Sequence, residues 1–244
     1  RIARKAGPGQ WAALRVKPPD AAIDRSDSGR DTDCMLTEHS VIIQRTKRSQ
    51  QKAATRETIL RSARSLYAER GIAATRSAAV AQAAGLAHGT LFLHFPRQEE
   101  LLVAVIEDFG ERLCRRLHEL SAGGRGLRAC LEAHIEGLRE EEGFYTALLT
   151  EAGHLPEAAR LSFLMVQSTL SWHLAAAAEA GMAAGTVKRQ PVHLLFNTWI
   201  GLVHHYLANR ELFAPGASVL ERLGGELVEH YLGLVSTQGR SQGG

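Results

Sequence analysis

The sequence is poor in cysteine and in aromatic residues, and it contains no long apolar run. Its three cysteines, in a chain of 244 residues, are odd in number and widely spaced, which argues against a disulfide framework and favours a reducing cytoplasm. Aromatic residues make up only 6% of the chain, while alanine, leucine and glycine are abundant, so helices are favoured over β-architecture. No apolar stretch reaches the ~18 residues that cross a bilayer, and the N-terminus lacks the pattern of a secretory signal.

Basic and acidic residues are unevenly distributed along the chain. The net charge is only +3, but residues 45–97 hold ten lysines and arginines against two acidic residues. Over residues 98–244, acidic residues outnumber basic ones. A basic segment joined to an acidic remainder indicates that one part of the chain meets a polyanion, although a solvated basic face without a partner would give the same pattern.

Glycine, proline and apolar periodicity divide the chain into four parts. Residues 1–50 lack helical periodicity and are expected to be a disordered basic tail, of which 1–34 precede the first methionine and are set aside. Residues 51–97 are predicted to form a small three-helix domain, 98–238 a helical domain, and 239–244 a second disordered tail. Glycine and proline separate the helices expected after residue 96: about 97–118, 127–141, 144–152, 156–181, 191–210 and 217–235.

Residues 74–95 carry the pattern of two helices joined by a tight turn. The small side chain of Ala81 allows the helices to approach each other, and Gly85, four residues later, accepts a positive φ in the turn. Leu91 and Phe95 share one side of the second helix and are expected to face the core. The opposite side is small and uncharged, which suits insertion into a DNA major groove, although the pattern alone also fits other helical hairpins.

The run TRETILRSARSLYAERGIAATRSAAVAQAAGLAHGTLFLHFPRQEELL, residues 55–102, resembles the DNA-binding domain of TetR-family regulators. The shared features are Ala-Glu-Arg-Gly at the end of the first helix, the Val-Ala-x-x-Ala-Gly-Leu turn, and Gly-Thr-Leu-Phe-x-His-Phe-Pro in the recognition helix. The resemblance implies an all-α protein, in which a three-helix helix-turn-helix domain precedes a helical bundle for ligand binding and dimerisation. It further implies a homodimeric transcriptional regulator, a repressor that a small-molecule effector releases from its double-stranded DNA operator.

The resemblance places DNA contacts at the start of the second helix, along the recognition helix and at the start of the fourth helix. These residues are Arg76, Ser77, His88, Gly89, Thr90, Phe92, Leu93, His94 and Gln98. Phe92 and Gln98 stand where the family usually has tyrosine and lysine, so two phosphate contacts are expected to be missing. We hypothesise that a flexible basic arm along the DNA backbone or into the minor groove compensates for them, formed by Arg45, Lys47, Arg48, Lys52 and Arg56.

Large and polar side chains interrupt the apolar stretches between the two ends of the chain. They are candidates to line an effector cavity, although each alone could equally be an ordinary core residue: Phe144, Tyr145, Leu148, Phe163, Met165, Gln167, Trp172 and His173. Ligand entry in this family shifts the fourth helix, so the same coupling is expected here.

Two of the last helices carry apolar residues at near-heptad spacing. This spacing predicts a four-helix bundle across a two-fold axis, with these residues at the interface: Val192, Phe196, Trp199, Val203, Tyr206, Leu220, Leu223, Leu227 and Tyr231. The alternative is that both stripes pack onto their own subunit.

No cofactor, metal site or enzymatic activity is expected. The eleven histidines show no recognised ligand spacing, and the chain contains no nucleophile elbow, P-loop or dinucleotide fingerprint. One alternative is a helical DNA-binding regulator without a small ligand, controlled by a protein partner or by dimerisation only. A helical enzyme or carrier is another, but the basic segment and the helix-turn-helix pattern argue against it.

Overall fold

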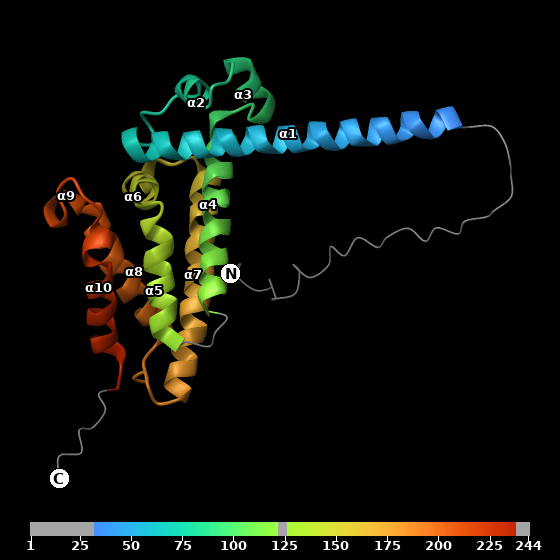
Figure 1. Ribbon diagram of the computed structural model, residues 1–244. Helices are drawn as coiled ribbons and strands as arrows, with labels where there is room; N and C mark the ends of the chain where they lie inside the picture. Colours follow the sequence, from blue (N-terminus) through green and yellow to red (C-terminus); the bar gives the residue numbers. More distant parts are fainter. Residues whose placement is uncertain (1–31, 122–125, 238–244) are drawn as a thin grey trace, which may run out of the picture. The chain divides into compact units, whose positions relative to one another are not determined.

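The computed structural model describes residues 32–121 and 126–237, which are almost entirely helical (Figure 1). The only bridge outside helices in these ranges joins Val187 to Ser236, so the all-α prediction is confirmed. None of the helices described is long and apolar enough for a membrane crossing. The elements are α1 (Thr32–Arg70), α2 (Ser77–Ala83), α3 (His88–His94), α4 (Gln98–Ser121), α5 (Gly126–Arg139), α6 (Glu142–Glu151), η1 (Ala152–His154), α7 (Glu157–Ala183), α8 (Val192–Ala208), α9 (Arg210–Phe213) and α10 (Val219–Val235).

Helix α1 begins earlier than the sequence indicates. Residues 32–50, expected to be disordered, are helical, while residues 1–31 and 238–244 of the expected tails lie outside the described residues. No glycine or proline occurs between Met35 and Arg70, so nothing interrupts a helix there. The prediction was wrong because it relied on an apolar stripe, which the first half of α1 lacks. Among the described residues, 32–48 and those from 49 onward belong to two separate units.

From α4 onward, the predicted helices agree with the structure to within three residues at each end. Helix α5 contacts α4, α7 and α10, while α8 contacts α7 and α10. Figure 1 shows α4, α5 and α7 running side by side, with α8 and α10 on the other flank of α5. Large side chains fill the interior of this bundle, among them Phe109, Trp199 and Tyr231, which are at most 1% exposed.

A carboxylate from α6 fixes the start of α10. Glu142 is buried, and its oxygens accept hydrogen bonds from the Val219 amide (2.8 Å), the Leu220 amide (3.0 Å) and the Ser218 hydroxyl (2.5 Å). The Ser218 hydroxyl in turn accepts from the Glu221 amide at 3.0 Å. Two acceptors, one of them 76 residues away in sequence, therefore satisfy the N–H groups that a helix leaves free in its first turn.

The predicted dimer stripes point mostly inward. Five of the nine side chains are buried in the chain's own bundle, so the prediction was wrong for Trp199, Val203, Leu220, Leu227 and Tyr231. The other four are half-buried: Val192, Phe196, Tyr206 and Leu223. The reason is physical: α8 and α10 must bury one face against α5 and α7 to complete the core, and the near-heptad apolar stripe is that face.

Candidate DNA-binding interface

A tight turn sets the geometry between α2 and α3. Gly85 adopts φ of 68°, a conformation that glycine accepts without steric cost. The Leu86 amide donates to the Ala81 carbonyl at 2.9 Å, and the Gly85 amide donates to the Gln82 carbonyl at 3.0 Å. These bonds close the C-terminus of α2 and turn the chain toward α3, as the spacing of Ala81 and Gly85 predicts.

Helix α3 has one buried side and one exposed side. Leu91 is 1% exposed and lies in the core, and Phe95 follows at the C-cap with 4% exposure. On the outer side Leu93 is 82% exposed and Phe92 is 41% exposed. The His88 ring packs edge-on against Phe92, with centroids 4.7 Å apart. A large leucine held this far into solvent gains nothing from the fold, so this face is available to a partner.

The remaining residues predicted to contact DNA differ in exposure and in hydrogen bonding. Gly89 is exposed, whereas Thr90 and His94 are half-buried. Arg76 is exposed at the N-cap of α2. Gln98 is bonded within the protein: its amide nitrogen donates to the Thr75 carbonyl at 2.8 Å, and its oxygen lies 3.5 Å from the half-buried hydroxyl of Ser77. Gln98 thus joins the start of α4 to the start of α2.

Basic side chains of α1 lie beside the end of α3. The Arg56 guanidinium lies over the Phe95 ring, 5.3 Å from its centroid. Partial burial lowers the pKa of His94, and the nearby charges of Lys52 and Arg56 lower it further, so His94 does not add a positive charge at neutral pH. Lys47 and Arg48 are exposed, and they belong to the first of the two units. The Arg45 side chain lies outside the described residues.

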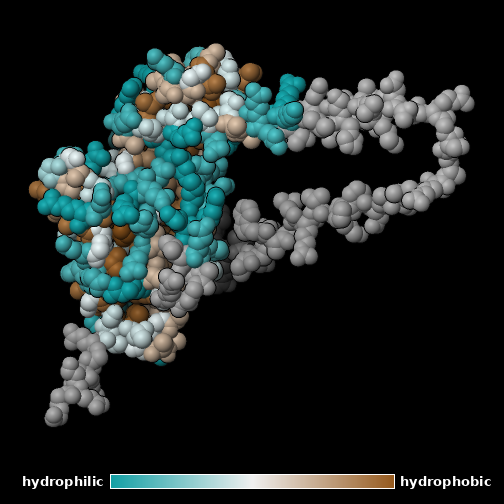
Figure 2. All heavy atoms as spheres, in the orientation of Figure 1, coloured by the Kyte–Doolittle hydropathy of each residue, from teal (hydrophilic) through white to brown (hydrophobic). Residues whose placement is uncertain are grey.

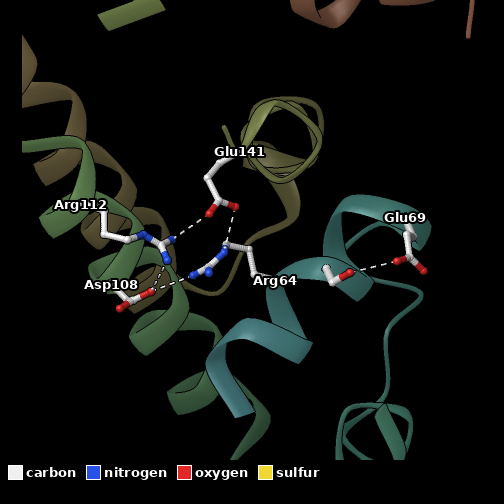
Figure 3. A network of polar contacts seen from close by, with 6 residues as sticks. Arg64, Glu69, Asp108, Arg112 and Glu141 are labelled. Carbon is white, nitrogen blue, oxygen red and sulfur yellow. Dashed lines mark hydrogen bonds and ion pairs between the residues drawn. The ribbon is translucent and has the colours of Figure 1, made fainter. Parts of the chain in front are cut away.

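Figure 3 shows a ring of four charges that joins α1 to α4 and to the α5–α6 turn. Arg64 contacts Asp108 at 2.7 Å and Glu141 at 2.9 Å, and Arg112 contacts the same two carboxylates at 3.2 Å each. Burial raises the pKa of Glu141, and the two arginines oppose this shift. The ring is partly buried, so it holds the part of α1 around Arg64 on the bundle more firmly than a solvated pair would.

A second carboxylate holds the loop that follows α1. Glu151, at the end of α6, accepts hydrogen bonds from the Ile72 and Ala73 amides at 2.8 Å each. Gly71 adopts φ of 85°, a conformation that favours glycine, and it lies close to the Glu151 carboxylate. These two bonds tie the end of α6 to the segment that leads into α2.

The predicted effector-cavity residues lie partly in the core and partly on the surface of the described residues. Met165 and Trp172 are 65% and 66% exposed on α7, so this part of the prediction was wrong. Gln167 and His173 are half-buried, and four others are packed in the core: Phe144, Tyr145, Leu148 and Phe163. A pocket of about 210 Å³ opens instead between α4 and α5, lined by Phe109, Leu113 and charged residues.

The core beside α6 contains paired polar groups that could not be predicted from the sequence. The Trp199 indole donates to Nδ1 of His134 at 3.0 Å, and the Tyr145 hydroxyl lies 2.7 Å from Nε2 of His204. His134 is fully buried, and its Nε2 has no hydrogen-bond partner among the described residues. Desolvation lowers the pKa of His134 to about 3 and that of His204 to about 4, so both imidazoles are neutral at pH 7.

Residues 59–105 match the family model described as "Bacterial regulatory proteins, tetR family". The chain is 30% identical over 122 residues to the HTH-type transcriptional repressor KstR2 of Rhodococcus jostii, which covers 48% of this chain and 60% of that protein. It is 42% identical over 60 residues to the HTH-type transcriptional repressor Rv3405c of Mycobacterium tuberculosis, covering 25% and 32% of the two chains. The matched segments thus span less than two thirds of either relative.

Solved structures share the fold of about three quarters of this chain at low sequence identity. A putative transcriptional regulator from Saccharomonospora viridis in complex with choline has a TM-score of 0.66 and 18% identity, covering 76% of this chain and all of that one (100%). FadR from Bacillus subtilis in complex with stearoyl-CoA has a TM-score of 0.62 and 18% identity, covering 72% and 97%. Residues 59–105 therefore match the tetR family of bacterial regulatory proteins, and the described helices share the fold of solved transcriptional regulators.

Proposed function

We propose that this protein is a sequence-specific DNA-binding transcriptional regulator, a repressor released from its operator by a small-molecule effector. The observation that carries the proposal is α3 itself: Leu93 projects into solvent on its outer face, and Lys52 and Arg56 of α1 lie near its C-terminal end at His94 and Phe95. An exposed helix with small and apolar side chains can approach base edges closely, and nearby lysine and arginine side chains supply phosphate contacts. Figure 2 shows apolar side chains over the α2–α3 region at the top of the view.

A homodimer would present two copies of α3 to two half-sites. Since the inner stripes of α8 and α10 are buried, we propose that their outward faces form the interface. These faces carry Leu194 and Leu234, each 51% exposed, and Gly201, whose Cβ position meets nothing within 4 Å. Leu194→Arg and Leu234→Arg are expected to give monomers in sedimentation analysis. Leu164→Arg, at an equally exposed position on α7 (50%), is the control and should leave the dimer intact.

The effector site is proposed to lie in the core around His134. Nδ1 of the neutral ring accepts from Trp199, so the ring proton is on Nε2, and this buried donor has no acceptor among the residues that the structure describes. An effector with a carbonyl or hydroxyl oxygen would satisfy it, and the relatives solved with stearoyl-CoA and choline show that this fold admits small molecules. One observation supports the alternative, a regulator without a small ligand: Tyr145 and Phe163 are densely packed in this core.

Selection of duplexes from a random DNA pool tests the proposed function. The full-length protein should enrich sequences with two related half-sites. Leu93→Ala should lower affinity for the enriched duplex by at least about tenfold, as the loss of one good base contact does. Leu212→Ala, at a leucine that is 75% exposed on α9, should not change it. Failure to enrich any sequence, with folded protein, would contradict the proposal.

A further inference from the structure

Three metal-binding side chains meet between α4 and α7, outside the DNA-binding region and the core polar cluster. Cys114 and His118 come from α4, and His173 comes from α7. One ligand atom from each residue lies within 4.8 Å of the other two. The sequence alone does not group these residues, because α4 and α7 are far apart along the chain.

The close packing of α4 on α7 brings the three residues together. Cys114 and His118 are one helical turn apart and share a face of α4. One turn earlier on the same face, a Cβ on Gly110 would lie 2.6 Å from a methyl group of Val166 on α7, so the backbones approach closely there. Val166 and His173 are two turns apart on α7, which places His173 beside His118, with ring centroids 5.0 Å apart.

We propose that Cys114, His118 and His173 form a binding site for a borderline-soft transition-metal ion such as Zn²⁺. One thiolate and two imidazoles are the donor types that Zn²⁺ and Co²⁺ prefer, and oxygen-seeking ions such as Mg²⁺ do not. Ligand bonds of about 2.0–2.3 Å require the three atoms to draw together by roughly an ångström. His118 is exposed and Cys114 is half-buried, so side-chain rotation alone can supply this movement.

The cluster supplies three ligands from the described residues, which leaves a fourth position for water or an exogenous ligand. Solvent can reach the site, because the adjacent Trp172 is 66% exposed and packs edge-on against His173 with centroids 4.9 Å apart. A bound ion would tie α4 to α7 near the far end of α4 from Gln98. Since Gln98 joins α4 to α2, the ion would also bias the DNA-binding domain; this extension rests on the proposed function.

Cobalt titration of the reduced, metal-free full-length protein tests the site directly. Co²⁺ should bind with one equivalent per chain and produce a thiolate-to-metal charge-transfer absorption that excess Zn²⁺ removes. Cys114→Ser should abolish this absorption. His118→Gln or His173→Gln should weaken Co²⁺ binding at least about tenfold, because removing a ligand costs at least as much affinity as removing a group that hydrogen-bonds to a ligand. The control is His193→Gln with His230→Gln, two exposed histidines elsewhere on the bundle.

The outcomes separate the metal site from the proposed function. No charge-transfer absorption in wild type, or one that persists in Cys114→Ser, would overturn the site. Equal weakening of Co²⁺ binding in the control variant would overturn it too, because the ion would then be bound by surface histidines at large. If Co²⁺ binds as expected but Zn²⁺ leaves the affinity for a selected duplex unchanged, the site stands and its coupling to DNA is refuted. Binding to the selected duplex by a protein that shows no Co²⁺ absorption would overturn the metal site and leave the proposed function intact.

Discussion

Removing the Glu142 carboxylate should destabilise the start of α10 and, with it, the whole bundle. In Glu142→Ala, the Val219 and Leu220 amides lose their acceptor, and both residues are at most 2% exposed, so water does not replace it. Each buried unsatisfied N–H costs about 1–3 kcal/mol, and the lost interaction of the carboxylate with the helix N-terminus adds about 0.5 kcal/mol. The gain from no longer burying a carboxylate offsets part of this sum, so we expect a net loss of about 3 kcal/mol.

Chemical and thermal denaturation measure this loss. A decrease of about 3 kcal/mol in the free energy of unfolding corresponds to a fall in Tm of about 6–12 °C for a chain of this size. Glu142→Gln keeps one acceptor oxygen and should lose about half as much. Ser218→Ala removes the local N-cap and should cost about 1 kcal/mol. A Glu142→Ala protein within about 0.5 kcal/mol of wild type would refute the reasoning, since such a value is typical of an unimportant surface site.

Three further predictions concern acid stability, helix packing and salt dependence. The pKa of His134 is lowered to about 3 in the folded state, against about 6.5 in the unfolded chain. The stability that the neutral ring contributes is therefore fully present above pH 6.5 and is lost as the pH falls toward 3, with a loss of about 2 kcal/mol at pH 5. His134→Gln should remove this loss from the pH dependence of the free energy of unfolding. Gly224→Ala should destabilise by about 1–3 kcal/mol because its Cβ would lie 2.6 Å from a methyl group of α5, whereas Gly225→Ala meets nothing within 4 Å and should stabilise by about 0.5–1 kcal/mol; equal effects in thermal denaturation would contradict this. Lys52→Gln with Arg56→Gln should reduce the slope of log affinity for DNA against log salt by about 2, and an unchanged slope would show that neither side chain meets a phosphate.

The helix-turn-helix could be predicted because its determinants are local. Gly85 and Ala81 lie four residues apart, and a proline ends the segment, so turn geometry and the buried face of α3 follow from short-range sterics. The start of α1 could not be predicted from periodicity, because the helix continues through residues 47–54, whose side chains are mostly exposed, and its only sequence signal is the lack of helix breakers.

The features that could not be predicted depend on how the helices pack against one another. The stripe containing Trp199 and Val203 has the spacing of a dimer seam, yet the bundle needs the same face for its own core. The acceptor role of Glu142 depends on a residue 76 positions away. Cys114 and His118 are four residues apart in the sequence, but such a pair is too common to indicate a metal site by itself. Only the packing of α7 on α4 brings His173 to the same place.

Fluorescence anisotropy with an enriched duplex and a scrambled duplex of the same composition tests the central claim most directly. The full-length protein would be titrated against both at several salt concentrations, with the stoichiometry determined at saturation. The proposed function predicts binding to the enriched duplex at least ~10³-fold tighter than to the scrambled one, with two chains, or a multiple of two, per site. Equal affinity for both duplexes at every salt concentration, from a folded protein, would contradict it.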